Sequence, residues 1–136
     1  MVKKIGFTGT QAGMSGRQAV GLATLLYRVL TNGEEFHHGM CKGADANAHF
    51  IATAVYKVIG HPPIKTDKMM DTDDSMVWFH EKRVPKDYLD RDQDIVDECD
   101  VLIATPRTRE EELRSGTWAT IRRARKAGKP VFILWP

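Results

Sequence analysis

A short β-prone run that passes into a glycine-rich turn decides how the chain begins: residues 4–13 read KIGFTGTQAG. A strand that leaves the core of a sheet needs a turn of this composition. Ser15 and Gln18 follow with the spacing of a capping box, and apolar residues then recur at helical spacing. The sequence therefore predicts a strand over residues 4–8, a loop, and a helix over about residues 16–31.

The same order of strand, glycine-bearing loop and helix repeats further along the chain. Residues 35–38 (EFHH) predict a second strand, and residues 39–43 (GMCKG) predict the loop that follows it. Apolar side chains at helical spacing predict a second helix over residues 44–59, which Gly60 and two prolines then end. We expect residues 64–66 (IKT) to form a short third strand.

Residues 101–104 (VLIA) are continuously apolar, which is typical of a parallel strand that is buried on both faces. A short acidic helix over residues 88–99 precedes this strand, and a helix over 116–127 and a strand over 131–134 follow it. Alternating strands and helices predict right-handed crossovers and helices on both faces of the sheet. We therefore expect the α/β class, with a Rossmann-like three-layer fold and a mainly parallel sheet of about five strands.

The expected strand order is 3-2-1-4-5, which places the switch point of the sheet between strands one and four. Ligands of open α/β sheets bind outside the carboxyl ends of the strands at such a point. The loops that follow strands one, two and four should therefore converge.

These three loops carry glycine beside hydroxyl or acidic residues. Glycine lets the backbone approach an anion closely, and each following helix directs unpaired N–H groups and the positive end of its dipole to the same point. The dinucleotide pattern GxGxxG and the P-loop pattern are both absent, which argues against a standard NAD site and a Walker-type NTPase. The candidate ligand-binding residues are Thr8, Gly9, Thr10, Gly13, Gly39, Gly43, Ala44, Asp45, Arg114, Ser115, Gly116 and Thr117.

The composition is that of a globular domain. Of the 136 residues, 42% are hydrophobic and 28% are charged, which is enough apolar surface to build a core. We expect residues 1–136 to form one domain, in which residues 66–87 are an irregular connection or arm that makes ligand or subunit contacts. Because no apolar run has the roughly 18 residues of a membrane span and no signal-peptide pattern is present, we expect a cytoplasmic protein.

The net charge, the cysteines and the histidines limit which ligands and partners the sequence predicts. The formal net charge of +2 gives no support to nucleic-acid binding. Cys41 and Cys99 lack the spacing of a metal or redox site, so we expect buried free thiols. The five histidines show no metal-ligand spacing either, and we expect neither a metal nor a cofactor.

Several segments resemble the SLOG superfamily, the Rossmann-like group that unites DNA-processing protein A with LOG-type phosphoribohydrolases. Residues 5–10 (IGFTGT) look like its first strand and loop, and residues 39–49 (GMCKGADANAH) look like its glycine-G-A/I-D-x-x-A-H segment. Residues 114–120 (RSGTWAT), with 127–131 (AGKPV), are similar to its third element, in which a Gly-Thr pair holds a phosphate. The resemblance covers most of the chain and implies a nucleotide or nucleotide-derived, phosphate-bearing ligand, bound for sensing or sequestration.

One position departs from the enzymes of this group. LOG enzymes and nucleoside deoxyribosyltransferases carry a glutamate shortly after the Gly-Thr pair, where this chain has Thr120. Threonine cannot act as the carboxylate that stabilises or attacks an oxocarbenium-like centre, which weighs against N-glycosidic cleavage. Asp45, Asp97, Asp100 and the glutamates at 110–112 could substitute for it, although helix capping, loop ordering or solvation also explains each of these acids.

The leading hypothesis is a binding protein, without a strong reaction of its own, that holds a nucleotide-derived small molecule across the three loops. A phosphoribohydrolase or deoxyribosyltransferase-like enzyme, and a mediator that binds single-stranded DNA, stay open as alternatives. Trp78, Phe79 and Tyr88 could stack a base or could pack in the core or between subunits. Relatives with this fold commonly dimerise, so the resemblance implies a homodimer or larger homo-oligomer without a membrane partner.

Overall fold

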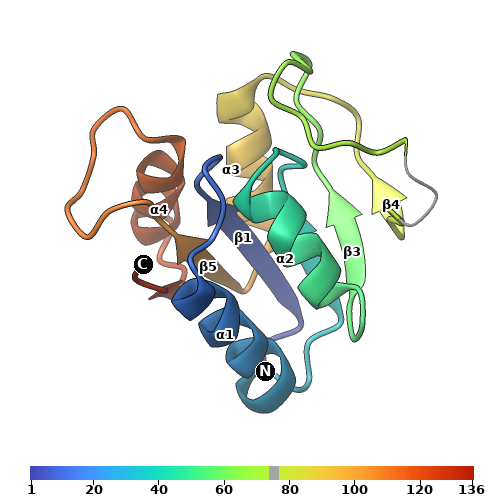
Figure 1. Ribbon diagram of the computed structural model, residues 1–136, viewed down its shortest axis with the longest axis vertical. Coiled ribbons are helices and arrows are strands. Elements are labelled where there is room, and N and C mark those ends of the chain that lie inside the picture. Colours follow the sequence, from blue (N-terminus) through green and yellow to red (C-terminus); the bar gives the residue numbers. More distant parts are fainter. Residues whose placement is uncertain (74–76) are drawn as a thin grey trace.

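A parallel six-stranded sheet forms the centre of the protein, with the strand order β4-β3-β2-β1-β5-β6. The computed structural model describes residues 1–73 and 77–136 (Figure 1). The strands are β1 (Lys4–Gly9), β2 (Glu35–His38), β3 (Lys57–Gly60), β4 (Glu81–Lys82), β5 (Val101–Thr105) and β6 (Val131–Ile133). The predicted α/β, Rossmann-like class is confirmed.

The helices form two further layers, one on each face of the sheet. They are α1 (Gly16–Thr24), which a π-helical turn continues (Leu25–Val29), α2 (Ala44–Ala52), α3 (Tyr88–Glu98) and α4 (Gly116–Lys126). Helices α1 and α2 pack together on one face, and α3 and α4 pack together on the other (Figure 1). This is the predicted three-layer arrangement.

The continuous apolar run of β5 packs against the helices on both faces of the sheet. Val101 and Ile103 belong to the core under α1 and α2, whereas Leu102 and Ala104 belong to the core under α3 and α4. Successive side chains of a strand point to opposite faces, so a central strand covered on both sides must be apolar at every position. The buried state predicted for Cys41 and Cys99 is also confirmed, and both thiols are free.

The predicted second helix and third strand are wrong in their positions. Helix α2 ends at Ala52, and residues 57–60 form β3, which pairs with β2. Val58 and Ile59 are both β-branched and buried, which favours a strand over a helix. Residues 64–66 lie beyond the sheet and form no strand.

The connection between β3 and β4 (residues 61–80) runs along the carboxyl edge of the sheet before it returns (Figure 1). Backbone hydrogen bonds tie it to the loop after β2: Lys42 N–H donates to the Lys68 carbonyl at 2.9 Å, and Met70 N–H donates to the Met40 carbonyl at 2.9 Å. The observed order contains the predicted order 3-2-1-4-5, in which the predicted strands four and five are β5 and β6. Strand β4 is an additional edge strand next to β3, and it lies inside the stretch 66–87 that we expected to be irregular. Residues 74–76 of that stretch lie outside the described residues.

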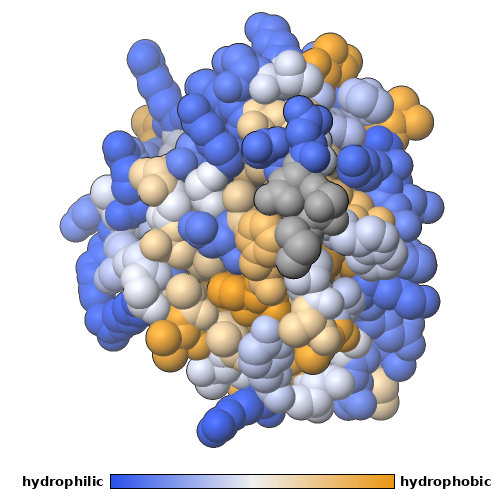
Figure 2. Space-filling view, turned by 45° about the vertical axis from the view of Figure 1, so that its right-hand side comes forward, coloured by the Kyte–Doolittle hydropathy of each residue, from blue (hydrophilic) through white to orange (hydrophobic). Residues whose placement is uncertain are grey.

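The outer surface of α1 and α2 carries exposed apolar side chains. Val20 of α1, Phe50 of α2 and Val55 in the turn after α2 are 68%, 54% and 56% exposed. Figure 2 shows apolar surface interspersed with polar residues on this side of the molecule. In the described part of the chain, no helix combines the length and the apolar character needed to cross a membrane.

Candidate ligand-binding cleft

A cleft of about 720 Å³ opens at the carboxyl edge of the sheet, where the loops after parallel strands meet. The loop after β1 forms one wall, and the first turns of α3 and α4 form others. Nine residues predicted from the sequence line this cleft: Thr8, Gly9, Thr10, Gly39, Asp45, Arg114, Ser115, Gly116 and Thr117. Segments that are about a hundred residues apart in the sequence therefore contribute to the same cavity.

The other three predicted residues lie behind the cleft and hold its loops in place. Ala44 N–H donates to the Thr10 carbonyl at 2.9 Å, and Gly13 N–H donates to the same carbonyl at 3.1 Å. Gly43 has a φ of +86°, and a Cβ there would lie 2.7 Å from the Gln11 Cα. Only glycine tolerates both the backbone angle and this close approach. These residues fix the loop after β1 against the start of α2.

The first turn of α4 supplies unpaired backbone donors. The Ser115 hydroxyl caps the helix by accepting a hydrogen bond from Trp118 N–H at 3.2 Å. Among the described residues, neither Gly116 N–H nor Thr117 N–H has a hydrogen-bond partner. Both residues line the cleft, so two free donors and the positive end of a helix dipole act at its wall. This combination is suited to an anion.

Arg91 is a cleft residue that the sequence analysis missed. It lies in α3 and is only 6% exposed. Its guanidinium donates to the carbonyl oxygens of Gly39 and His61, and its Nε lies 2.7 Å from an Asp92 carboxylate oxygen. One sequence pattern could have indicated it, because Arg91 lies four residues before Ile95 and therefore on the buried side of an amphipathic helix. A charged residue in that position needs buried polar partners.

Asp45 places a buried carboxyl group at the start of α2, 5% exposed. It accepts a hydrogen bond from Cys41 N–H at 3.1 Å. Burial raises the pKa of this carboxyl to about 7, and the nearby Arg91 charge limits the rise. Asp45 can therefore exchange a proton near neutral pH, and it also orders the loop after β2.

Asp92 is a second, partly buried carboxyl group in the cleft, and it was not predicted. Burial raises its pKa, while Arg91 and a hydrogen bond with the Thr120 side chain act in the opposite direction. Thr120 also lines the cleft. The position at which the resemblance would place a glutamate is thus occupied by a threonine, with a carboxylate from another helix beside it.

The remaining candidate acids divide between the cleft and distant surfaces. Glu112 lines the cleft, where Arg107 binds it at 2.8 Å. Asp100 lies at the opposite edge of the sheet and accepts hydrogen bonds from Lys3 N–H and Lys4 N–H, both at 2.9 Å. Asp97 is bonded to a neighbouring glutamine on the outside of α3. Asp97 and Asp100 are therefore structural or solvated acids.

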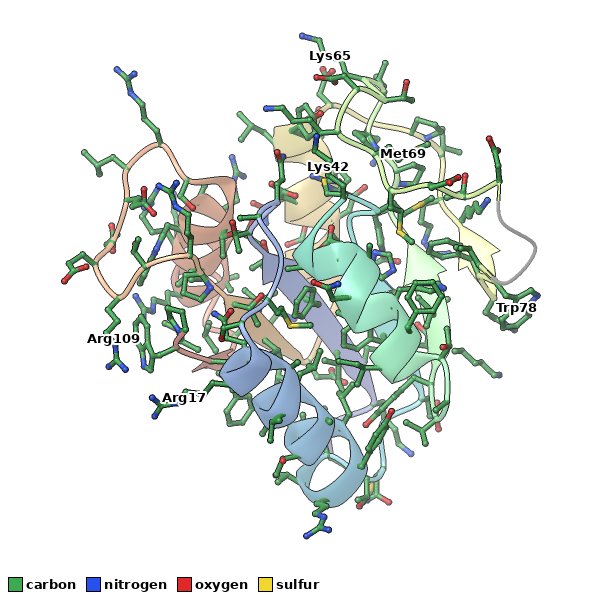
Figure 3. All side chains as sticks on the ribbon, viewed as in Figure 1. Arg17, Lys42, Lys65, Met69, Trp78 and Arg109 are labelled. Atoms are coloured by element: carbon green, nitrogen blue, oxygen red, sulfur yellow. The ribbon has the colours of Figure 1, made fainter. Side chains whose placement is uncertain are left out.

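Of the three candidate aromatic residues, Tyr88 alone lines the cleft. Its hydroxyl group is buried and has no hydrogen-bond partner among the described residues. The Phe79 ring packs against His49 at 4.4 Å between centroids, in the core. Trp78 is 61% exposed and projects away from the body of the protein (Figure 3).

The charge balance of the cleft is positive. Arg91 is paired with Asp92 and Arg107 with Glu112. Lys68 and Arg114 also line the cleft, and neither has an ion-pair partner within residues 1–73 and 77–136. Since the raised pKa of Asp45 leaves that carboxyl only partly charged near pH 7, the two free cations dominate.

Comparison with protein-family models and with curated protein sequences gives no match. Comparison with solved structures gives several. DNA processing protein A from Helicobacter pylori, described as binding single-stranded DNA, has a TM-score of 0.69 at 21% identity over 96% of this chain. This chain spans 64% of the length of that protein.

Two further structures share the fold. The molybdenum cofactor binding protein from the phototrophic bacterium Rippkaea orientalis has a TM-score of 0.71 at 21% identity and covers 100% of this chain and 78% of its own. The protein named TM1055 has a TM-score of 0.65 at 17% identity, over 95% of this chain and 72% of its own. These similarities concern the fold alone, and they confirm the Rossmann-like α/β architecture that the sequence predicts.

Proposed function

We propose that the cleft binds a nucleotide or a nucleotide-derived, phosphate-bearing small molecule. The observation that carries this proposal is the pair of N–H groups at Gly116 and Thr117, which have no partner among the described residues, in the same cleft as the Arg114 cation. A phosphate accepts hydrogen bonds from a helix N-terminus and pairs with a guanidinium group in a bidentate manner. The loop at Gly9 and Thr10 would approach the same anion from the other side.

Tyr88 supports an aromatic group on the same ligand. Its side chain borders the cleft, where an aromatic ring can stack on a ring of the ligand. The cleft volume of about 720 Å³ is in the range of pockets that bind small molecules. A base or comparable ring at Tyr88 and a phosphate at α4 would use both ends of the cleft.

Native mass spectrometry of the protein as purified tests this proposal directly, because a tightly held ligand is identified by its mass. Titration calorimetry with nucleoside mono-, di- and triphosphates and with inorganic phosphate follows. We expect Arg114→Ala to weaken binding of the phosphate-bearing ligand by about tenfold or more, because a charge-assisted hydrogen bond is lost. Arg109→Ala is the matched control, since Arg109 lies in the same loop and points away from the cleft (Figure 3).

Absence of any saturable binding, or equal losses in the Arg114 and Arg109 variants, would contradict the proposal. Equal losses would indicate that the net charge of the loop matters and that the cleft geometry does not.

The position of Asp92 beside Thr120 supports N-glycosidic cleavage as a second candidate function. A carboxylate from α3 would then supply the charge that the residue after the Gly-Thr pair cannot. A time course with nucleoside monophosphates, monitored for released base, measures this activity. We expect Asp92→Asn to abolish the release if Asp92 takes that role, and Asp97→Asn to leave it unchanged.

Single-stranded DNA is a third candidate because of the structural similarity to DNA processing protein A. Binding to phosphates falls steeply with salt, so the affinity for an oligonucleotide should be measured at several ionic strengths. An affinity for the oligonucleotide that does not change with salt would contradict binding through DNA phosphates. Oligonucleotide binding that a free nucleotide does not displace would show that the DNA binds outside the proposed nucleotide site.

We further propose that the protein forms a homo-oligomer through the exposed apolar surface of α1 and α2. Phe50 contributes a large apolar side chain to that surface, and Val55 in the turn after α2 extends it. Analytical ultracentrifugation should show a dimer or larger assembly that Phe50→Glu dissociates, and a wild-type chain that sediments as a monomer at all concentrations would contradict this.

A further inference from the structure

Two imidazoles and a carboxylate meet on the α3 side of the sheet, outside the cleft. His37 comes from β2, His61 follows β3, and Glu98 ends α3. His37 Nδ1 lies 2.8 Å from His61 Nε2 and 4.0 Å from a Glu98 carboxylate oxygen. The same oxygen lies 3.4 Å from His61 Nε2. Within residues 1–73 and 77–136, this is the group whose potential ligand atoms all lie within 4.8 Å of one another.

These separations match the ligand shell of a small transition-metal ion. Zinc binds imidazole nitrogen and carboxylate oxygen at about 2.0–2.2 Å, so the ligand atoms of a tetrahedral site are about 3.3 Å apart. The three separations in the structure, 2.8, 3.4 and 4.0 Å, lie on either side of that value. Three protein ligands leave one coordination position for water, and Glu98, at 32% exposure, provides the route from solvent.

The neighbouring residues orient the ligands. His37 Nε2 lies 2.9 Å from a Glu35 carboxylate oxygen, so that carboxylate holds the ring with Nδ1 directed at His61 and Glu98. Metal-binding histidines characteristically pair their second nitrogen with a carboxylate in this way. Arg83 donates to the other Glu98 oxygen at 2.8 Å, which leaves the first oxygen available as a ligand.

The charges also balance. Glu35 and Glu98 together carry two negative charges next to two imidazoles that are fully or almost fully buried. Arg83 is the nearby cation, and it also pairs with Glu81. A divalent cation would therefore neutralise the two carboxylates, and the Arg83–Glu81 pair would add no net charge.

We propose that His37, His61 and Glu98 bind one Zn²⁺ ion, with Glu35 as the positioning residue of His37. None of these residues lines the cleft. The metal would join β2, the start of the β3–β4 connection and the end of α3. Because the His61 carbonyl accepts a hydrogen bond from Arg91, the ion would hold the segment that positions this cleft residue. Its role is therefore structural support of the cleft.

No local spacing indicates this site, because His37, His61 and Glu98 come from three separate segments of the chain. A second buried histidine pair provides an internal control. His38 Nε2 lies 3.0 Å from His49 Nδ1 on the opposite face of the sheet. In the described part of the chain this pair does not form a group of three potential ligands with a carboxylate, so we expect it to bind no metal.

The test uses the full chain, freed of metal with a chelator and then titrated with Zn²⁺ by calorimetry. We expect one equivalent to bind and the midpoint of thermal unfolding to rise. Co²⁺ should give the visible absorption bands of a tetrahedral site. Glu98→Gln and His61→Gln should each lower the Zn²⁺ affinity by more than about 100-fold, and Glu35→Gln by about 10–100-fold. His49→Gln should leave the affinity unchanged.

Two results would overturn the proposal. One is a wild-type protein that shows no saturable binding of Zn²⁺ at micromolar free metal. The other is a stoichiometry and affinity that Glu98→Gln does not change. Since Glu98 is partly exposed and glutamine can still accept the hydrogen bond from Arg83, this variant should fold even if His61→Gln does not. Far-UV circular dichroism in chelator verifies that each variant is folded.

Discussion

The Arg91 guanidinium lies directly against the Gly39 backbone, so that a Cβ on Gly39 would be 2.7 Å from Arg91 Cζ and closer still to Nη1. The same guanidinium donates to the carbonyl oxygens of Gly39 and His61 and is bonded to Asp92. The loop after β2 and the first half of α3 thus form one side of the cleft together. The missing side chain at Gly39 is what allows the arginine to be there.

Gly39→Ala should lower the free energy of unfolding by about 1–3 kcal/mol, because a methyl group forces a buried, fully bonded guanidinium to move. Chemical denaturation measures this change. Ligand binding should weaken as well, since Arg91 borders the cleft. Gly16→Ala is the control, because a Cβ there meets no atom within 4 Å and should leave the stability equal or slightly higher. Equal effects of the two substitutions would contradict the role assigned to Gly39.

Ser115→Ala and Ser15→Ala remove equivalent helix caps from α4 and α1. Each should lower the free energy of unfolding by about 0.5–2 kcal/mol, since a first-turn N–H loses its acceptor. Only Ser115 lines the cleft, so Ser115→Ala alone should weaken the binding of a phosphate-bearing ligand. Denaturation and calorimetry on both variants separate the two effects. An equal loss of affinity in Ser15→Ala would contradict a local role of Ser115, because it would show that the lowered stability of the protein weakens binding.

Asp45 should make the protein less stable as the pH rises from about 4 to about 7. Its pKa is about 7 in the folded state because of burial, whereas an aspartate in the unfolded chain titrates near 3.9. In this window the folded protein retains a proton that the unfolded chain releases, so rising pH favours unfolding. Asp45→Asn should flatten this part of the stability profile, as measured by denaturation at several pH values.

Asp100→Asn provides the control with the opposite sign. Hydrogen bonds from Lys4 N–H and Lys3 N–H lower the pKa of Asp100, so its contribution to stability is present above the unfolded pKa and is lost as the pH falls through the folded one. The variant should therefore lose stability at neutral pH and become less sensitive to acid. A profile that Asp45→Asn leaves unchanged would show that the Asp45 carboxyl titrates normally.

The thiols of Cys41 and Cys99 should react very slowly with a thiol reagent in the folded protein. Burial raises the pKa of each to about 11, so at pH 8 roughly one thiol in a thousand is in the reactive thiolate form. In urea both should react at the rate of an ordinary cysteine. Fast reaction of one thiol without denaturant would show that its side chain is accessible, and Cys41→Ser and Cys99→Ser variants would identify it.

Elements with a single local pattern were predicted well. The capping box at Ser15, the buried run at 101–104 and the glycine loop before α4 all lie where the sequence placed them. The error over residues 44–59 arose because Val55 and Ile59 continue the apolar spacing of α2, although Val55 lies after the helix and Ile59 belongs to β3. Apolar spacing shows which side chains are buried, but over a short stretch it does not distinguish a buried strand from a buried helix.

The sequence by itself determined the alternation of strands and helices and the loops that carry glycine, because backbone conformation and periodic burial depend on neighbouring residues. Only the tertiary structure decided which distant side chains meet. Arg91 against Gly39, Asp92 beside Thr120 and His37 near Glu98 are contacts across more than 25 residues. Such contacts follow from the packing of whole helices on the sheet, which no local spacing encodes.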